Sequence, residues 1–270
     1  MGDIQSELIN NTMSTLTSYA SASARDSAAP ASSNTGLCIF RTDTKAIEVS
    51  DGTDYLAYNY DGISSQYSAN SYSGLFDGSA DYAKASVSAL NGNSGFSFSL
   101  WFKYGGSGGR AFFGTDAWTS GWFCTLDNNE ATITYGFNNT YAIFTLPTIS
   151  SSSWYHLALV HDGTSVTLYL DNSALSTATG KRSANQTWVG NNINLGRFGY
   201  SGASYFNGYM DEVAVFGRAL TSSEVSAIYS DKVYTSPAAV WRLENDTTDE
   251  VGTNDLTNNG VTFDASVKPY

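Results

Sequence analysis

Apolar and polar residues alternate with a period of two through much of this chain, most clearly between residues 154 and 171. There, the sequence WYHLALVHDGTSVTLYLD places two apolar runs on either side of the tetrapeptide HDGT. Asp-Gly is a strong turn signal, because both central residues of a type I′ turn need positive φ. After the turn, Val166, Leu168 and Leu170 alternate with more polar residues, as in a strand with one buried face. The segment therefore predicts an antiparallel hairpin.

Similar short apolar runs continue from residue 67 to about residue 230, separated by turn residues at regular intervals. That spacing favours a β-sandwich or jelly roll over alternating strands and helices. A helix is predicted near the end of this region, because Thr221 and Glu224 have the spacing of a capping box. Leu220 and Val225 flank them where a hydrophobic staple is expected.

The N-terminal part has a different pattern. Residues 3 to about 28 carry a weak apolar stripe at helical spacing: Ile9, Met13, Leu16 and Ala20. We expect either a helix that packs on a copy of itself or on another protein, or a frayed tail. Residues 31–66 are expected to form a small β-hairpin module, with turns near residues 42–45 and 51–53.

A further segment, residues 239–263, follows the predicted helix and reads AVWRLENDTTDEVGTNDLTNNGVTF. It is either a strand pair that returns to complete the sheet or the beginning of a second copy of the domain. The first is favoured, because the termini of a sandwich usually lie close together. We therefore predict three parts: a docking or oligomerisation segment (1–30), the hairpin module (31–66) and a large jelly roll (67–270).

Composition restricts the function classes. The 270 residues suffice for one large β domain, and the formal net charge is −12. An acidic chain without a cluster of Lys and Arg is a poor ligand for nucleic acid or an anionic membrane. No apolar run approaches the roughly 20 residues of a membrane helix, and the first residues do not resemble a secretory signal. Cys38 and Cys124 are expected to be buried free thiols, with a bridge between them left open.

Several motifs together resemble a known family: FDGSADY, FSLWFK, WYHLALVHDG, VTLYLDN, INLGRF and FNGYMDEVAVFGRALTSSEV. Their order and spacing are similar to those of the concanavalin A-like jelly roll of the laminin G-like, pentraxin-type group. The resemblance implies two facing antiparallel sheets, sugar or protein binding, and in several members a calcium ion. Residues 31–66 resemble small modules near the N-termini of bacteriophage fibre and appendage proteins.

No enzymatic arrangement is legible. A glycosidase needs two carboxylates that flank the scissile bond, and the glutamates of this chain do not follow the pattern of glucanase relatives. His156 and His161 are five residues apart on one predicted strand and should point to opposite faces. We therefore predict that the protein is not an enzyme.

Calcium is the one ion that the resemblance implies. In the family, carboxylates of the FDG and DEV strands approach each other at the rim, and the matching residues here are Asp77 and Asp211. The alternative is that Asp77 shapes its own turn and Asp211 pairs with Arg218 or Arg197. Glu212, next along the strand, is expected on the face opposite to that of Asp211.

A sugar site on this fold would combine stacking aromatic rings with neutral polar groups on the loops. The candidate ligand-binding residues are Trp118, Trp122, Trp188, Asn191, Tyr200 and Tyr205. Each aromatic residue is also a candidate for the core.

These observations lead to a functional hypothesis. A laminin G-like domain without a recognisable secretion signal, next to a phage-like module, suggests a virion structural protein: a fibre, a spike or a capsid decoration. It would form a homo-oligomer, with a trimer favoured, dock on other virion proteins through residues 1–60 and display the jelly roll towards a host-surface glycan or protein. The alternative is an extracellular, cellular carbohydrate-binding module that has lost its signal peptide.

Overall fold

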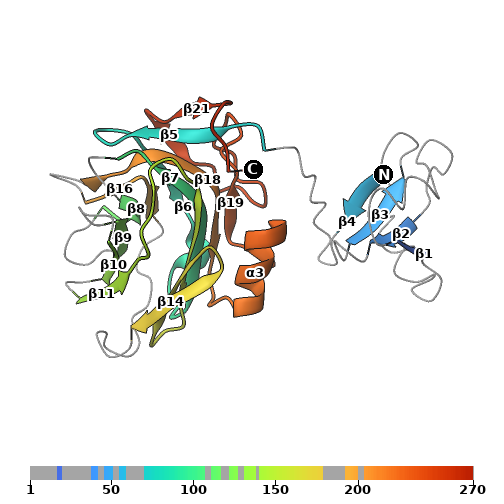
Figure 1. Cartoon of the computed structure of the whole chain (residues 1–270), viewed down its shortest axis with the longest axis horizontal. Coiled ribbons are helices and arrows are strands. Elements are labelled where there is room, and N and C mark those ends of the chain that lie inside the picture. The colour runs from blue at the N-terminus through green and yellow to red at the C-terminus, as the bar shows by residue number, and fades with distance from the viewer. Residues whose placement is uncertain are drawn as a thin grey trace. The chain divides into compact units, whose positions relative to one another are not determined.

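The computed structural model describes residues 70–106, 111–116, 122–126, 131–137, 140–178, 192–199 and 204–269, and four short strands before residue 60. The chain divides into two units, Met1–Ser68 and Ala69–Tyr270. The division falls two residues from the predicted start of the jelly roll (Figure 1).

The first unit contains a four-stranded sheet in the order β1-β2-β3-β4. Its strands are β1 (Thr17–Tyr19), β2 (Cys38–Arg41), β3 (Ala46–Ser50) and β4 (Tyr55–Tyr58). The pairs β2–β3 and β3–β4 are antiparallel. Both hairpins lie where the sequence predicts turns.

The helix predicted over residues 3–28 is wrong at residues 17–19, which form β1. This strand pairs in parallel with β2, with Thr17 opposite Ile39. Thr and Tyr are better strand formers than helix formers, and pairing with β2 gives their backbone groups partners without a packed helix face. The rest of the predicted helix lies outside the described residues.

The second unit is a sandwich of two antiparallel sheets (Figure 1). The first sheet has seven strands in the order β11-β10-β9-β8-β15-β6-β20. They are β6 (Tyr82–Ser86), β8 (Ala111–Gly114), β9 (Trp122–Leu126), β10 (Thr132–Phe137), β11 (Thr140–Thr145), β15 (Asn192–Leu195) and β20 (Thr257–Asn259).

The second sheet has eight strands, in the order β14-β13-β12-β7-β18-β5-β21, with β19 also paired to β18. They are β5 (Ser73–Asp77), β7 (Phe96–Tyr104), β12 (Tyr155–His161), β13 (Val166–Leu170), β14 (Ser173–Ala178), β18 (Asn207–Phe216), β19 (Ala239–Trp241) and β21 (Thr262–Asp264). A 3-10 turn, η2 (Ser88–Leu90), and a small ribbon of β16 (Arg197–Phe198) and β17 (Ser204–Tyr205) complete the strand region. The predicted hairpin is present as β12 and β13, with His161 opposite Val166.

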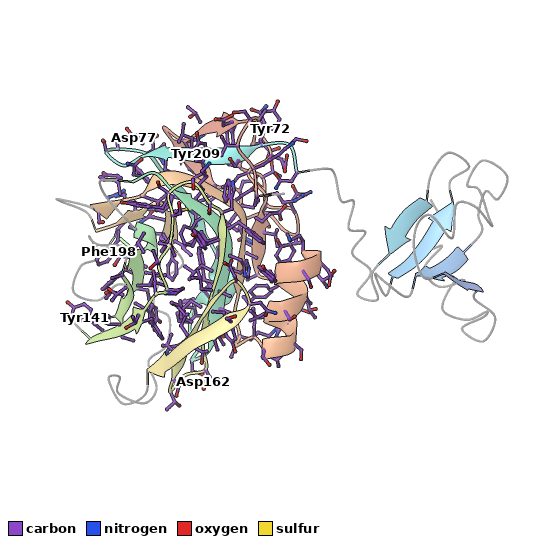
Figure 2. All side chains as sticks on the ribbon, viewed as in Figure 1. Tyr72, Asp77, Tyr141, Asp162, Phe198 and Tyr209 are labelled. Atoms are coloured by element: carbon purple, nitrogen blue, oxygen red, sulfur yellow. The ribbon has the colours of Figure 1, made fainter. Side chains whose placement is uncertain are left out.

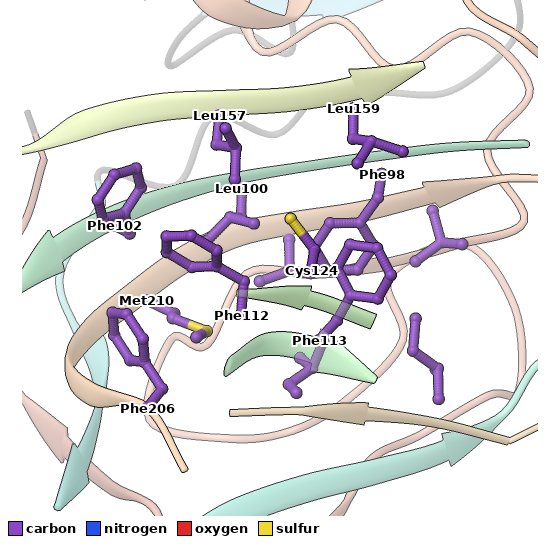
Figure 3. Packing of buried hydrophobic residues seen from close by; sticks show 14 of the residues in the cluster. Phe98, Leu100, Phe102, Phe112, Phe113, Cys124, Leu157, Leu159, Phe206 and Met210 are labelled. Carbon is purple, nitrogen blue, oxygen red and sulfur yellow. The ribbon is translucent and has the colours of Figure 1, made fainter. Parts of the chain in front are cut away.

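The core lies between the two sheets and is rich in aromatic rings. Phe102 of β7 and Phe112 of β8 come from opposite sheets, and their ring centroids are 4.7 Å apart (Figure 3). Cys124 of β9 is a free, fully buried thiol in the same core, and burial raises its pKa. Strand alternation supplies these inward side chains, because every second residue faces the other sheet.

One helix, α3 (Ser222–Asp231), covers the outer face of the eight-stranded sheet. The predicted capping box is present: the Thr221 hydroxyl accepts the Glu224 backbone N–H, and the Glu224 carboxylate accepts the Thr221 N–H. Leu220 and the α3 residue Val225 are buried in the same apolar cluster between the helix and the sheet. α3 is the only α-helix in the described parts of the chain, and no described helix is long and apolar enough to cross a membrane.

The C-terminal segment completes both sheets. β19 pairs with β18, β20 with β6 and β21 with β5. The side chain of Trp241 is fully buried in the core, and its indole N–H donates to the Asn254 carbonyl at 2.9 Å. The prediction of returning strands is confirmed, and the segment belongs to this domain.

Candidate functional site

The helix α3 packs on the outer face of the eight-stranded sheet. The outer face of the seven-stranded sheet lies on the other side of the sandwich and is not covered by α3. One line of cross-strand neighbours crosses all its strands: Thr257, Lys84, Asn194, Gly114, Phe123, Gly136 and Tyr141. Cross-strand neighbours point to the same face, so the sheet positions these side chains side by side. Polar residues occupy one half of the line, and aromatic residues with glycines occupy the other.

The polar half is organised around the carboxylate of Asp116. Its Oδ2 accepts from the Lys84 ammonium at 2.7 Å, and its Oδ1 accepts from the Asn194 amide at 3.0 Å. The Arg197 guanidinium lies 3.7 Å from Oδ1 and stacks over the Tyr82 ring, 4.5 Å from its centroid. About a third of the side chains of Lys84 and Asp116 is exposed, so the cluster is open to solvent.

The electrostatics of this cluster keep Asp116 charged. Burial by itself would raise the pKa of Asp116, but the hydrogen bonds from Lys84 and Asn194, with the charge of Arg197, hold it below its ordinary value. Within the described residues, two buried polar atoms of the cluster have no hydrogen-bond partner: Oδ1 of Asn194 and Nε of Arg197. One is an acceptor and the other a donor, and both atoms are buried beneath the partly exposed carboxylate of Asp116.

The aromatic half lies over two glycines. A Cβ on Gly136 would stand 2.2 Å from Cζ of Phe123, and a Cβ on Gly114 would stand 2.7 Å from Cβ of Phe198. The rings of Phe123 and Phe198 stack at 4.3 Å, and both are buried. Tyr141 packs against Phe123 with 45 % of its surface exposed. Phe198 and Tyr141 both lie on the side away from α3, where Tyr141 offers an open ring (Figure 2).

The predicted ligand-binding residues differ in where the structure places them. Trp122 is fully buried and packs edge-on against Phe96 in the core, so its assignment to a sugar site is wrong. Its place in β9 turns it inward, whereas the next residue, Phe123, faces outward. Tyr205 is partly exposed and pairs with Arg197, which places it beside the Asp116 cluster. Trp118, Trp188, Asn191 and Tyr200 lie outside the described residues.

The predicted calcium pair is not brought together. Asp77 lies opposite Asn207 at one end of β18, and Asp211 lies four residues further along that strand. At a rise of about 3.4 Å per residue, the positions of the two aspartates are separated by roughly 14 Å along the strand. The carboxylate of Asp77 instead accepts the backbone N–H groups of residues 79, 80 and 81, which confirms its role in its own turn.

Asp211 belongs to a different group of carboxylates. Its ligand oxygen and those of Glu212 and Glu244 lie within 4.8 Å of one another. The expectation that Glu212 faces away from Asp211 is therefore wrong. The pairing of β18 with β7 is irregular between Asp211 and Ala214, and Glu212 has a φ of 48°, so a bulge breaks the alternation. Burial raises the pKa of Asp211 well above its ordinary value.

The two arginines that were predicted as ion-pair partners of Asp211 interact with other carboxylates instead. Arg218 pairs with Glu224, and Arg197 lies near Asp116. The amide of Asn70 donates to Asp211 instead, at 2.7 Å. The two histidines do point to opposite faces, as predicted: His156 contacts Tyr229 of α3, whereas His161 stacks on Phe96 in the core.

Sequence reasoning missed Lys84 and Asn194, and it did not group Arg197 with Asp116. Lys84 alternates with buried residues in β6, and Asn194 alternates with the apolar Ile193 and Leu195 in β15, so the pattern places each on an outer face. The sequence pattern does not show that β15 lies between β6 and β8, and this order brings Lys84 and Asn194 together. Arg197 belongs to a two-residue strand, too short for a periodic signal.

Similar folds occur among solved structures. A protein from Bacteroides ovatus with a proposed role in carbohydrate binding matches with a TM-score of 0.59 and 15% identity, over 81% of this chain and 72% of that one. A heptameric SAP-like pentraxin from Limulus polyphemus matches with a TM-score of 0.55 and 15% identity, over 73% of this chain and 95% of that one. At these identities the likeness is one of fold.

A more distant likeness links the chain to tailspike protein 2 of bacteriophage CBA120, with a TM-score of 0.48, 16% identity, and coverage of 60% of this chain and 28% of that one. No protein of curated function matches the sequence. The Laminin_G_3 family model, described as the concanavalin A-like lectin/glucanases superfamily, matches residues 77–226. This span is more than half of the chain and contains most strands of both sheets, so the protein belongs to the Laminin_G_3 family of concanavalin A-like domains.

Proposed function

We propose that the jelly roll is a non-catalytic carbohydrate-binding module that holds a glycan against the outer face of the seven-stranded sheet. The observation that carries this proposal is the cluster around Asp116. A partly exposed carboxylate beside an ammonium, an amide and a guanidinium offers donors and acceptors for neighbouring hydroxyl groups. The family and the fold of its structural relatives agree with this assignment.

The surroundings of the cluster support the same proposal. Tyr82 and Tyr205 lie beside Arg197, and Tyr141 presents an exposed ring further along the same face. Aromatic rings of this kind stack on the apolar faces of sugars. Among the described residues of the cluster, Asp116 is the only carboxylate, whereas glycoside hydrolysis needs two. Binding without cleavage is therefore the activity that this chemistry supports.

Affinity electrophoresis of the full chain in gels that contain single soluble polysaccharides tests the proposal. The panel includes neutral β-glucans, arabinan and acidic bacterial capsule polysaccharides. We expect at least one to retard the protein, and Asp116→Ala and Lys84→Ala to remove most of that retardation. Asp231→Ala is the matched control, because this exposed aspartate ends α3 on the opposite side of the domain. Retardation that the Asp116 and Lys84 variants retain in full would reject the site.

We propose further that the module is displayed on a bacteriophage particle, as a fibre, spike or capsid decoration, with a secreted cellular lectin-like module as the alternative. The specific support is the first unit, whose short strands β2, β3 and β4 lie in the stretch that resembles phage appendage modules. Residues 1–60 would dock and oligomerise the protein, with a trimer favoured. Light scattering should then give a multiple of 28.9 kDa, and virions purified from the phage that carries this gene should contain the protein.

A further inference from the structure

The guanidinium of Arg197 is largely buried, yet it has no hydrogen bond to any of the described residues. Its side chain is 10% exposed, and Nη2 lies 3.7 Å from Oδ1 of Asp116. That separation exceeds the roughly 2.7–3.2 Å of an N–H···O hydrogen bond. Nε is buried without a partner, whereas Nη1 and Nη2 are not fully buried. The two terminal nitrogens therefore keep their donors for another group.

The cations of this cluster outnumber its carboxylates. In the described part of the chain, Asp116 is the only carboxylate that pairs with either cation, and its shortest contact is with Lys84, at 2.7 Å. Arg197 thus lacks a carboxylate of its own, although the chain has 25 acidic residues against 13 Lys and Arg. A mostly buried cation without a matched anion costs stability, which a bound anion would recover.

The surroundings of Arg197 fix the orientation of its guanidinium. The carbon Cζ lies over the ring of Tyr82, 4.5 Å from the ring centroid. Stacking on a ring uses the flat face of a guanidinium and leaves free the edge that carries Nη1 and Nη2. A carboxylate fits that edge with two parallel hydrogen bonds. The long contact with Asp116 does not use the edge in this way.

Lys84 and Tyr205 supply what a sugar carboxylate needs beyond this edge. The Lys84 ammonium donates one of its three protons to Asp116, and about a third of the side chain is exposed. Tyr205 is partly exposed and is the cross-strand neighbour of Arg197 in the β16–β17 ribbon, so the two side chains lie side by side. The group thus offers a carboxylate-binding edge, a second cation and an aromatic ring for the apolar face of a sugar.

We propose that the Asp116 cluster selects acidic glycans, with the carboxylate of a uronic or sialic acid bound by Nη1 and Nη2 of Arg197 and by Lys84. This inference rests on the proposed function, because it names the class of sugar that the same face would hold. Asp116 keeps Lys84 on this face through their 2.7 Å contact, so removal of Asp116 should weaken the same binding.

The first test compares probes that share a sugar ring and differ in charge. Polygalacturonate is paired with its methyl ester, and polysialic acid with its carboxyl-reduced form. In affinity electrophoresis of the full chain, we expect one of the two acids to bind about tenfold more tightly than its uncharged partner. Binding of polygalacturonate indicates a uronic acid, and binding of polysialic acid indicates a sialic acid. High salt should weaken the interaction.

The second test uses variants of the two cations. Arg197→Lys keeps the charge but loses the two-pronged edge, so binding of the acidic probe should fall about tenfold or more. Lys84→Gln should weaken the same binding, and it serves if Arg197→Lys does not fold. Lys103→Gln is the matched control, because Lys103 is a partly exposed lysine in β7 of the other sheet. This variant should bind like the unmodified chain.

The outcomes separate this proposal from the proposed function. Equal binding of an acid and its uncharged partner, or binding of neutral polysaccharides alone, would overturn the acidic specificity and leave the glycan-binding function in place. Equal retardation by dextran sulfate, or undiminished binding of the acid by both variants, would show a general attraction between charges and would also overturn it. If no polysaccharide retards the chain, both proposals fail.

Discussion

The guanidinium of Arg218 donates to both carboxylate oxygens of Glu224, with nitrogen–oxygen distances of 3.1 and 2.6 Å. The same carboxylate closes the capping box of α3 by accepting the N–H of Thr221. Arg218 also donates to the carbonyl of Thr235, beyond the end of the helix. One ion pair therefore links the last residues of β18, the start of α3 and the segment that leads to β19.

This ion pair predicts a pH dependence. The hydrogen bond from Arg218 lowers the pKa of Glu224 from 4.5 to about 2. Because the folded pKa lies below the unfolded one, the stabilisation is complete above pH 4.5 and is lost as the pH falls towards 2. We expect Glu224→Gln to reduce the free energy of unfolding by about 1 kcal/mol at pH 7, after discounting for the partial exposure of Arg218. The difference should vanish near pH 2, as measured by urea unfolding at both pH values.

His156 predicts a second acid-dependent effect. Burial, with the Lys232 ammonium as a smaller cause, lowers the pKa of His156 from 6.5 to about 3. Below pH 6.5 the unfolded chain binds a proton that the folded chain does not, so stability falls as the pH decreases towards 3. Between pH 7 and 4.5 we expect a loss of about 2–3 kcal/mol from this group.

The variant His156→Gln retains a partner for the Ser99 hydroxyl, which lies 2.9 Å from Nε2 of His156. It should be less stable than the unmodified chain at pH 7, but its free energy of unfolding should change less between pH 7 and 4.5. Parallel pH profiles for the two proteins would contradict this account of the buried histidine.

The ring of Phe123 leaves no room for a side chain at Gly136. A Cβ there would stand 2.2 Å from Cζ of Phe123, and the φ of Gly136 is not positive, so the obstacle is steric rather than conformational. We expect Gly136→Ala to destabilise the domain by about 1–3 kcal/mol. In a Phe123→Ala background the same change should cost much less, and a double-mutant cycle in urea measures the coupling. Additive effects would mean that the ring moves aside at little cost.

Trp241 tests whether the C-terminal segment is structural. Its side chain is completely buried, so Trp241→Ala should reduce the free energy of unfolding by about 3–5 kcal/mol. Trp154 provides the matched control, because it is partly exposed and its ring centroid lies 6.3 Å from that of Tyr209. Trp154→Ala should cost clearly less in the same denaturation experiment. Equal losses for the two variants would show that the segment after α3 contributes little.

The sequence predicted those parts of the fold that depend on local pattern. The β12–β13 hairpin follows from alternation around Asp-Gly, and the start of α3 follows from Thr221 and Glu224. The returning C-terminal strands could be inferred because the termini of a sandwich usually lie close together. In these places the local signal and the tertiary structure agree, which is what makes a sequence easy to interpret.

The candidate sites were harder to predict, because each depends on an interruption of a pattern or on strand order. Two-residue alternation predicts opposite faces for Asp211 and Glu212, and only the bulge brings their carboxylates together. The sequence pattern around Trp122 does not show which neighbour in β9 faces inward. The Asp116 cluster combines β6, β15 and the end of β8, whose adjacency is set by the whole sheet.

The pairing of β20 with β6 and of β21 with β5 has a consequence for how the domain is made. The first two strands of the jelly roll, β5 and β6, pair with β21 and β20, which lie almost 180 residues later in the sequence. Neither sheet has its final edge until those pairs form. Contacts between such distant segments form slowly, because a long loop must close before they contribute. On the ribosome, the nascent domain therefore exposes two unpaired strand edges until β20 and β21 have been synthesised. Those edges are where premature association with other chains would begin, and pairing with β20 and β21 removes them.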